Sequence, residues 1–313
     1  MSGFIAPGVF EIDTLLGGWE RVTAGYLLAG EAPVLVETGS QSSVPVLLAA
    51  LAQFGLAEAD LAGVVLSHIH LDHAGGVGDV ARAFPRATVY VHPKGARHLA
   101  DPSRLIASAA TVYGPALDSL YGRMSPVPEA RIRAVDHGEK IDLGGGRTLT
   151  ALHSPGHAKH HIALHDSESG VLFVGDAAGV KLPGPTALRP ATPPADFDLD
   201  LALQSLRLFA SRDPSRLALA HYGLLPEGPR EALEEAGGAL REWASVAEAA
   251  WASGEDVEHA LRARFASELD ALTADDRERL EALNGLHSNA EGLKLWLSRV
   301  RGARGEVGGQ VST

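Results

Sequence analysis

The chain has 313 residues, a formal net charge of -12 and an apolar fraction of 45%, which is enough for a sizeable hydrophobic core. It contains no cysteine, so disulfides, thiolate metal ligands and a cysteine nucleophile are excluded. The acidic balance argues against a long-range field that would attract nucleic acid or an anionic membrane.

The first ten residues lack the basic stretch and the apolar segment of a secretory signal. No run of the sequence approaches the roughly 18 consecutive apolar residues that a membrane span needs. We therefore expect a cytoplasmic protein that has a small-molecule substrate and has neither nucleic acid nor a membrane as its partner.

Short apolar runs separated by Gly, Pro and Asp predict strands over 9–12, 22–28 and 33–37. The polar residues after Gly39 are typical of a helix start, and apolar residues at helical spacing predict a helix over 44–54. These elements form the opening of a sheet with one helix packed against it.

Three histidines and one aspartate follow the next predicted strand, 64–67, within six positions: His68, His70, Asp72 and His73. Neutral imidazoles and carboxylates suit zinc, iron or manganese. A turn that leaves the end of a strand can direct all four side chains at one point. The H-x-H-x-D-H order therefore predicts a metal site that takes its remaining ligands from elsewhere in the chain.

After this motif the pattern predicts a helix over 77–84, a strand over 88–92 and two helical pieces within 102–121, where Gly114-Pro115 interrupts the period. Strands are predicted over 131–135 and 147–152, with the three glycines 144–146 as the turn between them. The repeated order of strand, helix and strand indicates an α/β fold.

Three further residues with metal-binding side chains follow apolar strand-like runs in the second half of the chain: His157, Asp176 and His221. The ends of strands in a packed sheet are rigid and adjacent in space. We therefore expect these three side chains to join the first four in one site.

From about residue 227 the composition shifts to Ala, Leu, Glu and Arg, which predicts helices over 229–251, 255–272 and 275–301. Their large aromatic residues are predicted to lie in the core, namely Trp243, Trp251, Phe265 and Trp296. We expect a catalytic domain over 1–225, a C-terminal helical region over 226–302 and a flexible tail over 303–313. Exposed apolar faces on the C-terminal helices would suit a homodimer.

The order His68-x-His70-x-Asp72-His73, followed by His157, Asp176 and His221, resembles the metallo-β-lactamase superfamily. That resemblance implies an αββα sandwich and two divalent metal ions, with zinc expected and iron or manganese as alternatives. It implies that one ion is bound by His68, His70 and His157 and the other by Asp72, His73 and His221, while Asp176 bridges both. Asp72 has two readings, a metal ligand and a catalytic general base.

The helical C-terminal part is similar in placement to that of the glyoxalase-II-like branch. The resemblance therefore implies a hydrolase that uses a metal-bridging hydroxide to cleave a small ester-like substrate, a thioester or a lactone. Two alternatives stay open, a small-molecule phosphodiesterase and an oxidoreductase with a single iron that resembles persulfide dioxygenases.

Other residues have two readings each, a role beside the metals and an ordinary structural role. They are His153, His160, His161 and Glu37, and for the substrate pocket Tyr113, Tyr121, Arg123, Met124, Tyr222, Asn284, His287 and Asn289.

Overall fold

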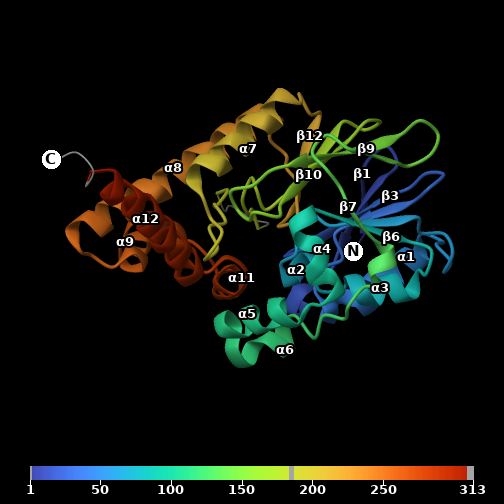
Figure 1. Cartoon of the computed structure of the whole chain (residues 1–313), viewed down its shortest axis with the longest axis horizontal. Coiled ribbons are helices and arrows are strands. Elements are labelled where there is room, and N and C mark those ends of the chain that lie inside the picture. The colour runs from blue at the N-terminus through green and yellow to red at the C-terminus, as the bar shows by residue number, and fades with distance from the viewer. Residues whose placement is uncertain (1, 183–186, 309–313) are drawn as a thin grey trace.

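Two mixed sheets form the centre of the computed structural model, which describes residues 2–182 and 187–308 (Figure 1). The strands of the first sheet, in spatial order, are β1 (Ser2–Ala6), β2 (Val9–Asp13), β3 (Ala24–Leu28), β4 (Val34–Val36), β5 (Gly63–Val65), β6 (Thr88–Val91) and β7 (Ile132–Ala134). Those of the second, in spatial order, are β13 (Gly223–Leu224), β12 (Arg216–Leu219), β11 (Val171–Gly175), β10 (Ile162–Asp166), β9 (Thr148–His153) and β8 (Lys140–Asp142).

The central strands are apolar on both faces because both faces are covered. In β4, Val34 and Val36 pack in the cluster between the two sheets, while Leu35 packs in the cluster under the helices of the first sheet. In β11, Phe173 faces the other sheet, and Leu172 packs under the helices of the second sheet. Burial on both faces explains why these strands appear in the sequence as continuous apolar runs.

Helices cover the outer face of each sheet, which completes the predicted αββα arrangement (Figure 1). The helices that follow strands of the first sheet are α1 (Val44–Gln53), α2 (Leu71–Ala74), α3 (Val77–Ala83), α4 (Pro93–Ala100), α5 (Ser103–Tyr113) and α6 (Leu117–Leu120). The second sheet is covered by α7 (Leu199–Ser211) and α8 (Pro229–Ser253), and short 3-10 turns lie at 16–18, 41–43, 114–116 and 129–131. The predicted division of the segment 102–121 into two helical pieces is confirmed by α5 and α6.

The C-terminal helices extend to one side of the sandwich (Figure 1). They are α8, α9 (Val257–Arg264), α10 (Ala266–Asp270), α11 (Ala274–Asn284) and α12 (Leu286–Gly308). The helix predicted over 255–272 is wrong in that it breaks at Phe265, whose ring is buried against Trp243 with ring centroids 5.2 Å apart. The helix predicted over 275–301 also breaks, at Gly285, where ψ is 142° and the backbone is extended.

One hydrophobic cluster extends from the second sheet through α7 and α8 to α12, so the helical region shares its core with the sandwich. The division of the chain at residues 225 and 226 stays a prediction. Helix α12 continues into the expected tail as far as Gly308, and 309–313 lie outside the described residues.

Three expectations are wrong in detail. The glycine turn 144–146 joins β8 to β9 of the second sheet, whereas β7 belongs to the first sheet, so this turn does not connect the strands predicted over 131–135 and 147–152. The sequence pattern also missed β1, β8, β10, β13, α4 and α7. Trp251 is 39% exposed and does not belong to the core, unlike Trp243 and Trp296.

Within residues 2–182 and 187–308, none of the helices has the combination of length and hydrophobicity that would let it cross a bilayer.

Candidate metal centre

The seven predicted metal-binding side chains meet between the ends of the two sheets. His68 and His70 lie in the loop after β5, and Asp72 and His73 lie in α2. From the second sheet, three residues complete the cluster, His157 after β9, Asp176 after β11 and His221 after β12.

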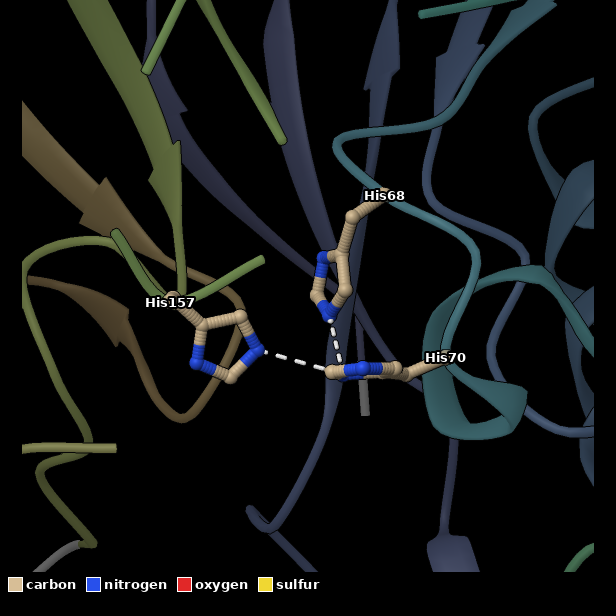
Figure 2. Close-up of side chains that lie close together, drawn as sticks. All are labelled: His68, His70 and His157. Atoms are coloured by element: carbon tan, nitrogen blue, oxygen red, sulfur yellow. Dashed lines mark hydrogen bonds between the residues drawn. The ribbon is translucent and has the colours of Figure 1, made fainter. Parts of the chain in front are cut away.

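The first group of three consists of His68, His70 and His157, whose rings converge in Figure 2. Nε2 of His68 lies 2.9 Å from Nδ1 of His70, and Nε2 of His157 lies 3.1 Å from the same atom. His70 therefore presents its Nδ1 to the other two rings, whereas His68 and His157 present Nε2.

The second group consists of Asp72, His73 and His221. Nε2 of His221 lies 3.2 Å from Nε2 of His73 and 3.3 Å from Oδ2 of Asp72. Oδ2 of Asp72 is also 3.5 Å from Nε2 of His73, so these three ligand atoms surround one point.

Asp176 lies between the two groups and turns one oxygen toward each. Its Oδ2 is 3.5 Å from Nε2 of His157, while its Oδ1 is 3.4 Å from Nε2 of His73 and 3.5 Å from Nε2 of His221. Oδ1 is buried and has no hydrogen-bond partner in the described part of the chain. A buried carboxylate oxygen in that position fits a bound cation.

Three of the histidines are held from behind by their second ring nitrogen. Nδ1 of His157 donates to the carbonyl oxygen of Ala191 at 3.1 Å, and Nδ1 of His221 donates to that of Val22 at 2.9 Å. Nδ1 of His68 lies 2.9 Å from Oγ of Ser67. A donor at Nδ1 leaves the lone pair of Nε2 free to bind a metal, so the two carbonyl oxygens fix both the tautomer and the ring orientation of His157 and His221, while Ser67 orients the ring of His68.

Glu37 stands behind the fourth histidine, as the sequence suggested. Its Oε1 accepts a hydrogen bond from the Ser67 amide at 3.2 Å, and its Oε2 lies 3.7 Å from Nδ1 of His73. Thr38, the next residue, donates from its backbone amide to the carbonyl oxygen of His73 at 2.9 Å. The turn after β4 therefore braces α2 and the loop before it.

The charges of the cluster also fit divalent cations. Burial and the neighbouring histidines hold the pKa of His68 well below its usual range, and burial lowers the pKa of His70 to about 4. Burial alone would raise the pKa of Asp176, but the nearby His73, His221 and His157 outweigh it and hold that pKa far below its usual range. Burial alone would lower the pKa of His73 and of His221, but Asp176 and Asp72 outweigh it and raise both. The first group thus offers neutral imidazoles and the carboxylates attract positive charge to the second group, which suits zinc, iron or manganese.

The remaining histidines near the motif have different roles. His161 is buried, its Nε2 accepts a hydrogen bond from the Asp176 amide at 3.2 Å, and its Nδ1 lies 2.8 Å from Oγ of Ser154. His160 stacks on His68 with ring centroids 6.2 Å apart. His153 packs on His92, with its Nε2 3.0 Å from the carbonyl oxygen of Val135, outside the cluster.

Three residues that sequence reasoning did not single out support the cluster: Ser67, Gly175 and Ala191. Gly175 has φ +49°, and a Cβ there would lie 2.5 Å from Nε2 of His161 and 2.8 Å from Oγ of Ser67. A glycine directly before a metal-binding aspartate at a strand end was the available sequence signal for the close approach. The Ala191 carbonyl left no such signal because it acts through its backbone.

A pocket of about 210 Å³ opens onto the cluster. Its walls come from Tyr113 at the end of α5 and Tyr121 directly after α6, from the loop 191–194, and from the junction of α11 and α12 with Asn284 and Asn289. A larger open groove of about 700 Å³ lies between α7 and α8, and none of the seven predicted metal-binding residues lines it.

Four residues proposed for the pocket lie elsewhere. Arg123 is exposed and pairs with Asp118 at 3.0 Å, and Met124 is buried in the core of the first sheet. Tyr222 lies under Arg21, with the guanidinium 5.4 Å from the ring centroid. His287 is exposed and its Nδ1 lies 2.9 Å from Oε2 of Glu258. The prediction that these four line the pocket is wrong, because none of them is among its walls.

Comparison with known proteins gives a consistent picture. The family model described as metallo-beta-lactamase superfamily matches residues 17–221. The metallo-beta-lactamase fold-containing protein ST1585 of Sulfurisphaera tokodaii is 28% identical over 209 residues, which cover 66% of this chain and 74% of that protein. The crystal structure of ST1585, from Sulfolobus tokodaii, has a TM-score of 0.67 at 24% identity and covers 92% of this chain and 98% of that one, which shows a shared fold.

Two relatives with named activities match over a shorter part. The acyl-coenzyme A thioesterase MBLAC2 of Gallus gallus is 34% identical over 115 residues, 36% of this chain and 40% of that protein. The hydroxyacylglutathione hydrolase of Aeromonas salmonicida is 30% identical over 143 residues, 46% of this chain and 41% of that enzyme. The match thus spans about two fifths of the length of each of these two relatives.

Proposed function

Because this chain belongs to the metallo-β-lactamase superfamily, a family of metal-dependent hydrolases, we propose that it is a dinuclear hydrolase that cleaves a small thioester or lactone. Zinc is the ion we expect, with iron and manganese as alternatives that the same ligands accept.

The position of Asp176 carries this proposal. One of its oxygens faces His157 and the other faces His73 and His221, which is the arrangement that a bridging carboxylate needs. In the proposed assignment, His68, His70 and His157 hold one ion, and Asp72, His73 and His221 hold the other. Asp72 acts as a ligand in this assignment, because its Oδ2 lies within 3.5 Å of both histidine nitrogens of its group.

A pair of bound dications would lower the pKa of a water molecule from about 15.7 towards about 7 and would polarise the substrate carbonyl. The chain's own contribution is to orient the ligands. Val22 and Ala191 fix the rings of His221 and His157, and His161 holds the backbone of Asp176. In the net reaction, water adds its oxygen to the acyl carbon, the carbon–sulfur or ring carbon–oxygen bond breaks, and the leaving thiol or alcohol takes up a proton.

The substrate class rests on two further observations. The pocket volume of about 210 Å³ suits a small acyl group more than a whole carrier molecule. The relatives named acyl-coenzyme A thioesterase and hydroxyacylglutathione hydrolase both act, by their names, on thioesters. A thioester is therefore the first substrate to test.

The test is thiol release from a panel of thioesters, including a glutathione thioester, followed with a thiol-reactive dye. The protein has no cysteine, so it does not itself react with the dye. We expect turnover with two metal ions per chain by elemental analysis, and a loss of at least about a hundredfold in Asp176→Asn. Asp200→Asn, an exposed aspartate on α7, is the matched control.

Normal turnover and metal content in Asp176→Asn would contradict the bridging role. Thiol release from none of the thioesters would leave lactones and then phosphodiesters to be tested. A single bound iron, with oxygen consumed in the presence of a persulfide, would replace the hydrolase proposal by the oxidoreductase alternative.

A further inference from the structure

The pocket above the metal cluster is poor in positive charge. No lysine or arginine is among the described residues that line it. The charged residue of its wall outside the cluster is Glu281, whose side chain is 37% exposed. An anionic group on the acyl part of a substrate would find no lysine or arginine among these lining residues and would lie near the carboxylate of Glu281.

The two tyrosines of the opposite wall stay protonated near neutral pH. Burial, with Asp72 nearby, raises the pKa of Tyr113 to about 12, and the same causes raise the pKa of Tyr121 well above its usual range. Their rings pack together with centroids 4.8 Å apart. This wall is therefore aromatic and uncharged.

Asn284, the last residue of α11, is a polar residue of these walls that has one unsatisfied group. Its side chain is 6% exposed, and its Nδ2 donates to the carbonyl oxygen of Pro190 at 3.2 Å. A carbonyl can only accept, so this contact fixes which end of the amide is the nitrogen. The other end, Oδ1, is buried and has no hydrogen-bond donor in the described ranges.

The neighbouring Asn289 has a structural role at this junction. Its Oδ1 accepts from the amide and the hydroxyl of Thr192, and its Nδ2 donates to the carbonyl oxygens of Asn284 and Gly285. Both ends of Asn289 are satisfied within the protein. Asn284 in contrast leaves an acceptor unused in a pocket wall, which is unfavourable unless a ligand supplies the donor.

We propose that Asn284 determines substrate specificity, and that the pocket selects an uncharged acyl group that carries an O–H or N–H donor for Asn284 Oδ1. This inference rests on the hydrolase activity proposed above and names the acyl part of its substrate. Asn284 acts by binding and takes no part in the bond changes of hydrolysis.

The test uses S-ethyl thioesters, because ethanethiol as the leaving group has neither charge nor donor. Four acyl groups are compared with the metal-loaded enzyme: butyryl, 3-hydroxybutyryl, N-acetylglycyl and succinyl. We expect kcat/KM for the better of the two donor-bearing substrates to exceed that for butyryl by about tenfold, and succinyl to be the poorest. Comparison of the 3-hydroxybutyryl with the N-acetylglycyl thioester identifies which donor, a hydroxyl or an amide, the site prefers.

The same four substrates are then measured with Asn284→Leu, which keeps the approximate size and removes the acceptor. We expect the preference to disappear in this variant, so that the ratio of kcat/KM for the donor-bearing substrate to kcat/KM for butyryl falls to about one. Ser288→Ala changes another polar side chain of the same wall and should keep the preference. Circular dichroism and thermal unfolding establish that both variants fold.

A second measurement does not depend on turnover. Ketone analogues, in which a methylene replaces the sulfur, are titrated calorimetrically with and without the hydroxyl group, and Asn284→Leu should lose the difference in affinity.

Cleavage of butyryl and donor-bearing thioesters at equal rates would overturn the specificity proposal and leave the hydrolase proposal intact. A preference that survives in Asn284→Leu, or that disappears in Ser288→Ala, would overturn the assignment to Asn284. Cleavage of none of the thioesters, together with equal binding of both ketones, would overturn the specificity proposal and the choice of a thioester as substrate, and lactones would be the next substrates to test.

Discussion

Asn289 on α12 holds the backbone of Thr192, whose amide nitrogen donates to Oδ1 of Asn289 at 2.7 Å. The residue before Thr192 is Ala191, and its carbonyl oxygen accepts the hydrogen bond from Nδ1 of His157. A side chain of the C-terminal helices is thus two hydrogen bonds away from a predicted metal ligand. The helical region supports the metal centre as well as the pocket.

Asn289→Ala should lower the free energy of unfolding by about 1–3 kcal/mol, because the buried amide of Thr192 loses its acceptor. Urea denaturation measures this change. Ser298→Ala, on the exposed side of the same helix, is the control and should change stability by less than about 0.5 kcal/mol. Equal stability of the two variants would mean that the contact with Thr192 does not contribute.

Gly292 permits the close approach of α12 to the same loop. A Cβ at this position would lie 1.9 Å from the carbonyl oxygen of Thr192, so Gly292→Ala should destabilise the protein by about 1–3 kcal/mol through overpacking. The matched substitution Gly238→Ala lies on α8 with nothing within 4 Å, and it should stabilise by about 0.5–1 kcal/mol. Thermal unfolding of the two variants should therefore shift in opposite directions, and shifts of the same sign would contradict this packing.

Glu37→Gln should weaken metal binding by about 10- to 100-fold, because a carboxylate behind an imidazole increases its basicity as a ligand. Glutamine retains an acceptor for the Ser67 amide, so the fold should survive. Competition with a chromogenic chelator gives the affinity, and Glu58→Gln, an exposed glutamate, is the control. Equal affinities in both variants would rule out this contribution of Glu37.

A buried ion pair away from the candidate metal centre should control stability in acid. Nη2 of Arg147 lies 2.6 Å from Oδ2 of Asp166, and the two side chains are 6% and 0% exposed. Burial would raise the pKa of Asp166, but Arg147 and Ser169 outweigh it and lower that pKa. A folded pKa below the unfolded one gives stability that is present above the unfolded pKa, near pH 4, and is lost as pH falls through the folded pKa.

Asp166→Asn should therefore cost about 3–5 kcal/mol at pH 7 and should flatten the loss of stability below pH 4, because Arg147 is left buried without its partner. Denaturant unfolding at several pH values gives both effects. Glu234→Gln breaks an exposed pair with Arg230 and should change stability by less than about 1 kcal/mol. A pH dependence unchanged in Asp166→Asn would contradict the role of this pair.

The sequence was sufficient to predict the metal cluster, because its residues follow simple local rules. His68 and His70 lie two positions apart in a dense motif, and Asp176 and His221 each follow an apolar run that is buried on both faces of its sheet. Strand ends of a packed sandwich lie together, so a correct prediction of the strands was enough to group these residues.

The pocket was predicted less well, since it depends on how distant elements fold against one another. His287 and Asn284 are close in the sequence, yet His287 points to Glu258 while Asn284 lines the pocket. The break at Gly285 separates them, and no periodicity marks it. Strands β8 and β10 were missed for a similar reason. Both are short, and their pairing partners cannot be recognised from local composition.

The donors of the cluster come from both sheets, with His73 beside the first and His157, Asp176 and His221 at strand ends of the second. Neither half of the polypeptide can hold a complete centre by itself. During synthesis the N-terminal half leaves the ribosome first, so the set of donors is complete only after β12 has joined the second sheet. A metal ion bound by donors from both sheets would link the two halves, and resistance of the folded protein to proteolysis should then increase with the concentration of free metal.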